Sequence, residues 1–261
     1  SFDVKITLPK DYRIMATGDL MDGEEEYAWL DSLTVVADSI HSLPEKDFKK
    51  WVKSQKKKSD SDTTSSEMKT LHFHQHHVHD FAWFADKKWL VQKGKLNLAD
   101  STRKVTLWSF YLPKNAKLWE NSIEYLHDSG YWYSRYYGDY PYNHITAVDG
   151  DLSAGGGMEY PNITVISKMP GKQMLEMVIM HEVGHNWFYG ILGSNERYHT
   201  WMDEGLNQYT NIRYWQDKYS AQNGRFIIQD FVQNKIGIGK NLKESWTQYL
   251  SYSFSAKSPK A

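Results

Sequence analysis

Hydrophobic and polar residues alternate along the first stretch of the chain. Residues 2–8 read FDVKITL, so every second side chain is apolar. A period of two predicts a strand that buries one face and exposes the other. Other runs rich in β-branched and aromatic residues predict strands at Tyr12–Thr17, Trp29–Ala37, Leu71–Trp83 and Val105–Leu112. Residues 1–85 are therefore expected to be rich in β-structure.

The pattern then changes to a helical period. Residues 115–137 form an aromatic, amphipathic run that ends at Gly138. Residues 173–188 carry apolar side chains at helical spacing, with Gly190 as the expected C-terminal cap. Two strand-like runs lie between these helices, at His144–Val148 and Ile163–Ile166. Helices and strands both occur, and the predicted fold class is α+β.

A basic and then serine-rich stretch interrupts the predicted strands of the N-terminal portion. Lysines are concentrated in residues 49–58 and serines in residues 59–66. A segment with many like charges and few apolar residues is usually solvated. We therefore expect a mobile surface loop here.

Two histidines one helical turn apart carry the strongest chemical signal. His181 and His185 lie in the sequence HEVGH, so both imidazoles can reach one ion while Glu182 projects beside them. Glu204 follows in the sequence WMDEGLN, where a second helix is expected to begin. Without this carboxylate, two ordinary helix histidines would explain the pair equally well. Two histidines and a glutamate with an open fourth position are typical of catalytic zinc, so the sequence predicts one Zn²⁺ at these three residues.

A glycine-rich segment precedes the histidine pair. Residues 155–161 read GGGMEYP and lie between the two strand-like runs. Glycines let a backbone approach another chain closely, which suits a sheet edge that pairs with an extended peptide. A carboxylate beside such an edge, here Glu159, could hold an ammonium group. The alternative interpretation is a flexible hairpin with one solvated glutamate.

Together these segments resemble the zinc aminopeptidases of the aminopeptidase N family. Its members carry Gly-x-Met-Glu-Asn, then His-Glu-x-x-His, then a glutamate that often lies within Trp-x-x-Glu-Gly. This chain has Gly156–Tyr160, His181–His185 and Trp201–Gly205 in the same order and spacing. A weaker likeness covers Val78–Trp83, and Tyr160 stands where the family usually has asparagine.

The resemblance implies an activity and a role for each motif. The family removes N-terminal residues from peptides, so the expected partners are peptide substrates with a free N-terminus. The zinc would polarise the scissile carbonyl, and Glu182 would move a proton from the attacking water to the leaving amine. Glu159 would bind the substrate's α-amino group, and the backbone of Gly157 and Met158 would align the peptide.

The resemblance also implies a division of the chain. Residues 1–85 would be the C-terminal part of a β-sheet N-terminal domain, and residues 86–261 a thermolysin-like catalytic domain. The family also has a tyrosine that stabilises the oxyanion, farther along than Tyr249 and Tyr252. Because this tyrosine is not found, we expect a fragment that is incomplete at its C-terminus. Loss of such a donor would make turnover weak. The chain also opens within a predicted strand at Ser1, so a truncated start is expected as well.

Composition narrows the partners but not the compartment. The chain has 31 Lys and Arg against 32 Asp and Glu, a net charge of −1 that gives no reason to expect nucleic acid binding. It has no cysteine, which excludes disulfides and thiolate ligands. No run of eighteen apolar residues occurs, so no membrane span is predicted. Localisation and oligomeric state are not indicated.

A second group of histidines lies far from the first. His72, His74 and His76 alternate along a predicted strand, so they are expected to share one face. Such a face can bind a transition metal adventitiously. No catalytic carboxylate accompanies them, and a structural histidine cluster is the preferred interpretation.

Other functional classes use the same residues. A thermolysin-like endopeptidase would need His181, Glu182, His185 and Glu204 but not Glu159. A non-enzymatic scaffold that retains the fold is a second alternative, which the intact ligands and base disfavour. The family also includes an epoxide hydrolase activity.

Overall fold

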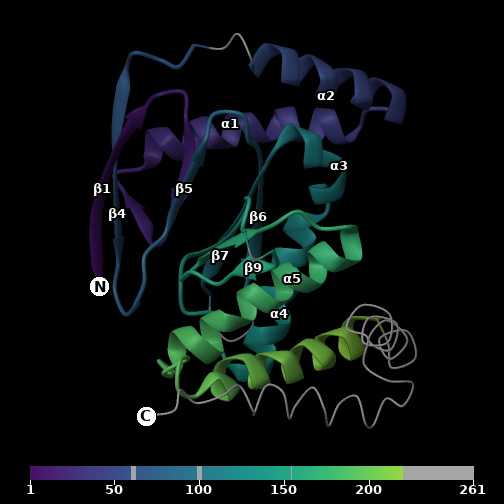
Figure 1. Ribbon diagram of the computed structural model, residues 1–261. Coiled ribbons are helices and arrows are strands. Elements are labelled where there is room, and N and C mark those ends of the chain that lie inside the picture. Colours follow the sequence, from purple (N-terminus) through teal and green to yellow (C-terminus); the bar gives the residue numbers. More distant parts are fainter. Residues whose placement is uncertain (60–62, 99–101, 154, 220–261) are drawn as a thin grey trace.

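The computed structural model describes residues 1–59, 63–98, 102–153 and 155–219. Three sheets and a set of helices form a mixed α and β fold, as the sequence predicts at this level (Figure 1). Among the described helices, none combines the length and the apolar character needed to cross a bilayer. Tyr249 and Tyr252 lie outside the described residues.

Two small antiparallel sheets form the N-terminal part. The first has the strand order β1-β4-β3, and the second pairs β2 with β5. Their bounds are β1 Phe2–Pro9, β2 Arg13–Ala16, β3 Asp19–Met21, β4 Met68–Gln75 and β5 Trp83–Asp86. Val4 pairs with Phe73 in β4, and the apolar side chains of β1 face the core as the alternating pattern predicts.

The prediction of a strand at Trp29–Ala37 is wrong, because these residues belong to helix α1, Glu24–His41. Leu30, Ala37 and Ile40 are buried at helical spacing, whereas Val35 is 68% exposed. Three glutamates in the first turn favour the helix N-terminus. The β-branched pair in the middle suggested a strand, but the spacing of the buried positions decides the structure.

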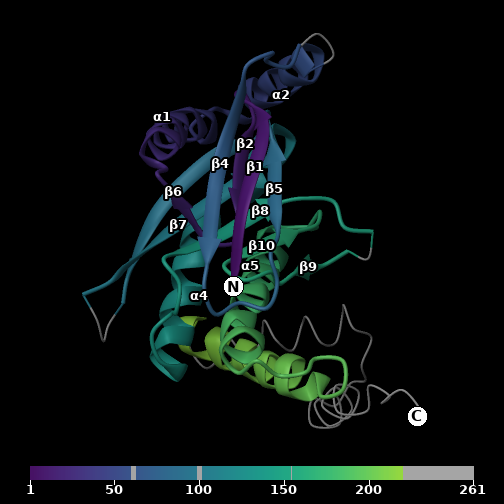
Figure 2. The same cartoon turned by 90° about the vertical axis from the view of Figure 1, so that its left-hand side faces the viewer.

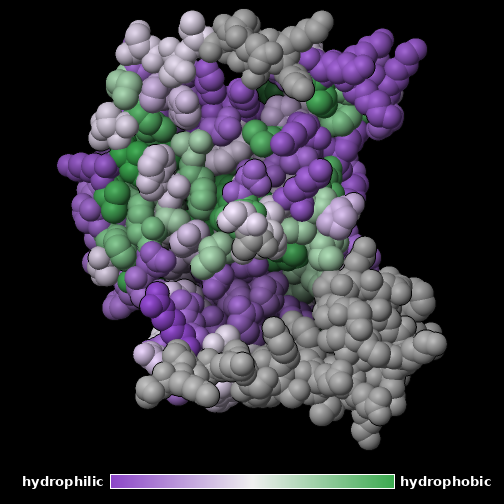
Figure 3. All heavy atoms as spheres, viewed as in Figure 1, coloured by the Kyte–Doolittle hydropathy of each residue, from purple (hydrophilic) through white to green (hydrophobic). Residues whose placement is uncertain are grey.

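The prediction of a loop over the lysine-rich stretch is also wrong for most of its length. Helix α2 covers Glu45–Ser59. Phe48, Trp51 and Val52 pack on the core from one face, and Glu45 pairs with Lys49 at 3.1 Å one turn later. Figure 3 shows hydrophilic atoms over the end of the molecule where α2 lies.

A five-stranded sheet forms the centre, in the order β6-β7-β8-β10-β9. The strands are β6 Leu90–Asn97, β7 Lys104–Tyr111, β8 His144–Asp149, β9 Gly157–Met158 and β10 Ile163–Ile166. β8 is parallel to β7 and β10, while β6 and β9 run antiparallel to their neighbours. β9 is therefore the strand at one edge of this sheet.

The two faces of the central sheet bury different layers. On β7, Leu107 packs with the helices, whereas Trp108 and Phe110 pack with the N-terminal strands. Figure 2 shows these N-terminal strands over one face of the sheet. The second core cluster thus contains residues from both sides of position 85, and the division into 1–85 and 86–261 stays a prediction.

Helices cover the other face. The 3-10 turn Pro113–Asn115 and α3, Ala116–Trp119, lead into α4, Ser122–Tyr137, which ends at Gly138 as predicted. Helix α5, Lys172–His185, packs along α4 and continues directly as the π-helical turn η2, Asn186–Ile191. Gly190 is therefore not a cap, because it lies inside that turn. Gly193 takes the left-handed conformation, with φ +57°.

A further helix over residues 206–219 follows a second π-helical turn, η3, Trp201–Gly205. An ion cluster holds this helix against α4 and α5. Nζ of Lys218 lies 2.7 Å from a carboxylate oxygen of Asp128 and 2.7 Å from one of Glu176. Lys218 and Glu176 have side chains only 11% and 5% exposed, so the pair is largely shielded from water.

Candidate metal centre

Helix α5 places the two histidines of the HEVGH sequence one above the other. Their Nε2 atoms lie 3.2 Å apart. Oε2 of Glu204, from η3, lies 3.2 Å from Nε2 of His181 and 3.8 Å from Nε2 of His185. These three residues form one of two groups in the described chain whose ligand atoms are close enough to share a metal ion.

The three donor atoms fit zinc in chemistry and in spacing. Zinc binds imidazole nitrogen and carboxylate oxygen at about 2.0–2.2 Å, so a tetrahedral arrangement separates the donor atoms by roughly 3.3 Å. The three separations of 3.2, 3.2 and 3.8 Å lie around this value. Although burial raises it, the close contact with the imidazole of His181 lowers the pKa of Glu204 to about 2, so the carboxylate is ionised. The structure thus brings together the three residues that the sequence predicts as ligands.

Asp203 holds the second histidine from behind. Nδ1 of His185 lies 2.5 Å from Oδ1 of Asp203, and both side chains are almost completely buried. Burial alone would lower the pKa of His185, but the hydrogen bond and charge of Asp203 raise it to about 9. A histidine whose Nδ1–H donates to a carboxylate presents Nε2 to a metal. A bound metal replaces the proton that this high pKa would otherwise keep on the ring.

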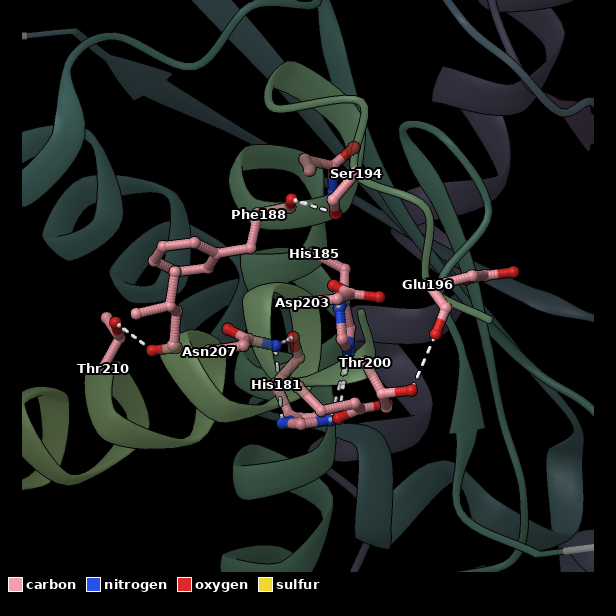
Figure 4. A network of polar contacts seen from close by, with 12 residues as sticks. His181, His185, Phe188, Ser194, Glu196, Thr200, Asp203, Asn207 and Thr210 are labelled. Atoms are coloured by element: carbon pink, nitrogen blue, oxygen red, sulfur yellow. Dashed lines mark hydrogen bonds and ion pairs between the residues drawn. The ribbon is translucent and has the colours of Figure 1, made fainter. Parts of the chain in front are cut away.

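A different set of residues surrounds the first histidine. Asn207 and Asn211 face His181 from the helix 206–219, and Tyr133 reaches both asparagines from α4. Figure 4 shows Asp203 and Asn207 approaching the two imidazoles from the neighbouring chain segment. Gln208, four residues after Glu204, contacts Asn211 rather than a histidine. Its Oε1 lies 3.4 Å from Nδ2 of Asn211.

Glu182 lies beside the candidate ligands in a tight, buried position. Glu182 is 5% exposed, and its Oε2 has no hydrogen-bond partner among the described residues. Burial raises the pKa of Glu182 to about 7, against the opposing effect of the two imidazoles. A Cβ atom on Gly157 would lie 2.5 Å from Oε1 of Glu182, so the carboxylate occupies space that only glycine leaves open.

The glycine-rich segment forms the sheet edge next to this site. Gly157 and Met158 make up β9 and pair with Ile166 and Val165 of β10. Glu159 follows directly, and one of its carboxylate oxygens lies within 4.8 Å of ligand atoms of both His185 and Asp203. The predicted edge strand and its carboxylate therefore face the same place as the histidine pair.

More acidic groups lie around Glu159. Burial, and then the negative charges of Glu159 and Asp203, raise the pKa of Glu196. Arg197 and His185 oppose this rise. An excess of carboxylates on one side of the site produces a negative potential that attracts a cation.

Comparisons with known proteins were made for sequence and for structure. No protein-family model and no curated protein matches the sequence. An M1 zinc metallopeptidase from Deinococcus radiodurans has a TM-score of 0.54 at 18% identity, covering 90% of this chain and 44% of its own. The described fold resembles part of the M1 zinc metallopeptidase fold. The chain spans less than half the length of these structures.

Two further similar structures are of mutant M1 zinc metallopeptidases with bound molecules. One holds L-tryptophan, with a TM-score of 0.55 and 17% identity over 96% of this chain and 44% of the enzyme. The other, from Deinococcus radiodurans, holds a Tyr-Ser-Ala substrate, with a TM-score of 0.54 and 15% identity over the same shares.

Tyr160 occupies the position after the edge-strand glutamate. Tyr160 packs its ring 6.0 Å from that of Phe84, which belongs to β5. The residue that departs from the usual family motif thus contacts the N-terminal strands. Nearby, His79 from the Val78–Trp83 segment lies with its ring 3.8 Å from Tyr189 of η2.

The second histidine group occupies the exposed face of β4. Asp3 lies 2.8 Å from Nε2 of His72 and 3.1 Å from Nδ1 of His74, and Nε2 of His74 lies 2.9 Å from Nε2 of His76. The three histidines share a face, as the alternation predicts. Neither metal-competent group in the described residues includes them.

Proposed function

We propose that this protein is a zinc-dependent aminopeptidase with one Zn²⁺ held by His181, His185 and Glu204. The observation that carries the proposal is the set of three donor atoms at tetrahedral spacing beside the buried carboxylate of Glu182. Two imidazoles and one carboxylate leave a fourth position for water or substrate, as in catalytic zinc sites.

The chain's own residues move the proton. When bound, zinc supplies a positive charge that polarises the scissile carbonyl and makes water more acidic. Glu182 receives a proton from the attacking water on its carboxylate and later gives it to the leaving amine. Its position next to both histidines and its burial by Gly157 fix the carboxylate for these two transfers.

The acidic side of the site gives the proposal its substrate class. Glu159 binds the free α-amino group of a peptide, and the nearby carboxylates of Asp203 and Glu196 favour a cationic group there. The backbone of Gly157 and Met158 at the open side of β9 aligns the extended peptide. A related M1 structure holding a tripeptide substrate is consistent with this class.

The proposal includes the two-part organisation of the chain. We assign residues 1–85 to a β-rich N-terminal part, whose strands pack on the central sheet, and residues 86–261 to a thermolysin-like part that carries the zinc. An aminopeptidase uses the anchor at Glu159, whereas an endopeptidase with the same zinc residues does not need it.

The test compares one peptide with a free N-terminus and the same peptide after N-acetylation, with the zinc-loaded protein. We expect release of the first residue from the free peptide only. The matched variant Glu159→Gln should lose this preference while it keeps zinc. Equal cleavage of both peptides would identify an endopeptidase, and full zinc loading without cleavage of either would favour a scaffold.

A further inference from the structure

A buried network of hydrogen bonds runs from His181 to helix α4. Tyr133 contributes its hydroxyl, and Asn207 and Asn211 contribute their amides from the helix 206–219. All three residues are at most 3% exposed. The hydroxyl oxygen lies 2.5 Å from Oδ1 of Asn207 and 2.8 Å from Oδ1 of Asn211. Nδ2 of Asn211 lies 2.8 Å from Nδ1 of His181.

The number of polar hydrogens in this network fixes which group donates each hydrogen bond. Nδ2 of Asn207 donates to the backbone carbonyl of His181 at 2.7 Å. A carbonyl can only accept, so the amide of Asn207 cannot be turned around, and its Oδ1 must face Tyr133. The single phenolic proton is then used on Asn207. It cannot also serve an oxygen of Asn211.

The conflict disappears when the amide of Asn211 is rotated by 180°. Oxygen and nitrogen of an amide have nearly the same shape, so both distances of 2.8 Å are preserved. Nδ2 of Asn211 then donates to the hydroxyl oxygen of Tyr133, and Oδ1 faces Nδ1 of His181. The 3.4 Å contact with Gln208 is long, and that side chain can turn its own amide.

We propose that Tyr133 is a positioning residue that, through Asn207 and Asn211, keeps the imidazole proton of His181 on Nδ1. The lone pair of Nε2 then points toward His185 and Glu204, the orientation a metal requires. This inference rests on the proposed zinc site. It adds Tyr133, a residue on another helix, which sets the orientation of the Asn211 amide.

Gly184, inside the HEVGH sequence, leaves the space that this hydrogen-bond network needs. A side chain at Gly184 would overlap both Oδ1 of Asn207 and the hydroxyl of Tyr133. The absence of a Cβ atom lets these groups meet directly on the surface of α5.

Removal of the hydroxyl should release the amide of Asn211. In a Tyr133→Phe variant, its Nδ2 has no acceptor at the ring and can turn toward Nδ1 of His181. The imidazole proton then moves to Nε2 and blocks the metal-binding lone pair. In an Asn211→Asp variant both side-chain oxygens are acceptors, so the orientation no longer depends on Tyr133.

The test measures the zinc dissociation constant by competition with a chelating dye, without reference to turnover. Loss of an orienting partner typically weakens metal binding by about 10- to 100-fold, and we expect this for Tyr133→Phe. In the Asn211→Asp background, the same replacement should change the constant by no more than about twofold. Tyr137→Phe is the matched control, because its hydroxyl also joins α4 to the helix 206–219, at 2.8 Å from Thr210, but does not touch the histidine network.

Two results would overturn the inference alone. Unchanged zinc binding in Tyr133→Phe would remove the role of the hydroxyl, and a failure of Asn211→Asp to restore binding would leave Tyr133 a merely structural residue. If Tyr133→Phe does not fold, nitrogen-15 spectra of the metal-free wild-type protein decide the question. A neutral His181 with its proton on Nδ1 supports the inference, and one with its proton on Nε2 contradicts it. A wild-type protein that binds no zinc would contradict the proposed function as well.

Discussion

Two groups of histidines lie in this molecule, and they differ in what holds them. On α5, His185 is 1% exposed and Nδ1 lies 2.5 Å from the buried carboxylate of Asp203. On β4, His72 and His74 share Asp3, whose side chain is 62% exposed. The strand group has more imidazoles but no buried partner. Fixed partners from separate elements, rather than the number of histidines, distinguish the candidate metal centre.

Water explains the difference in physical terms. An exposed carboxylate and imidazole can exchange their contact for solvent at little cost, so their geometry is weakly determined. A buried pair has no such alternative and keeps its orientation. The α5 pair therefore presents its Nε2 atoms in a defined direction, while the β4 histidines can each turn independently. The predictions below test this contrast.

The largest expected effect concerns the base that accompanies only the α5 pair. Glu182→Gln keeps the shape of the side chain but cannot accept a proton. We expect peptide hydrolysis to fall by about 10²- to 10⁴-fold while zinc affinity is unchanged. Hydrolysis rate and zinc content should be measured on the same preparation. Retention of full turnover would show that another group acts as the base.

The second prediction disturbs the same base through its neighbour on β9. In Gly157→Ala, the new Cβ atom would lie 2.5 Å from Oε1 of Glu182 and must displace it. A displacement near 1 Å typically costs on the order of 100-fold in rate, with zinc retained. The control is Gly171→Ala, because a Cβ there meets nothing within 4 Å. Equal rates for the two variants would argue against a fixed position of Glu182.

The third prediction weakens the buried partner of one histidine and the exposed partner of the others. Asp203→Asn removes the charge behind His185 but keeps an oxygen acceptor. We expect zinc affinity to fall by about 10-fold, at the lower end of the usual range for such partners. Asp3→Asn is the matched change at the strand group and should leave zinc affinity unaltered. Similar losses in both variants would erase the contrast between the two groups.

The smallest effect is expected for the strand histidines themselves. A His74→Ala and His76→Ala double variant removes the two imidazoles whose Nε2 atoms lie 2.9 Å apart. Zinc stoichiometry and peptide hydrolysis should stay within about twofold of the wild-type values, because an exposed cluster contributes little to the buried site. Loss of one bound zinc in this variant would show that β4 carries a metal site of its own.

Much of the site could be predicted because its signals are local or regularly spaced. His181 and His185 lie on one helix, whose period fixes their relation. The strands β8 and β10 could also be predicted, because strands buried on both faces form short, mainly apolar runs in the sequence. By contrast, helix α1 carries Val35 and Val36 on its exposed side, and these β-branched residues favour a strand. Packing of the opposite face overrides that preference.

Asp203 lies next to Glu204 in the sequence, but Tyr133 could not be predicted as part of the site, because it comes from a distant segment. Tyr133 lies 74 residues before Asn207 in the chain, yet their side chains touch. Asn207, Gln208 and Asn211 follow Glu204 at spacings that share one helical face, so spacing alone does not say which of them meets His181. The close approach of Glu182 to Gly157 likewise depends on how β9 packs on α5.

The ion cluster around Lys218 has a consequence for how the protein assembles. Its partners Asp128 and Glu176 lie on α4 and α5, so the cluster forms only when the helix 206–219 has docked. The same docking delivers Glu204, whereas both histidines are already present on α5. Tight zinc binding therefore requires the docked chain, and the metal favours that state by mass action. During refolding, zinc uptake would follow the docking of this helix and would stabilise the docked state.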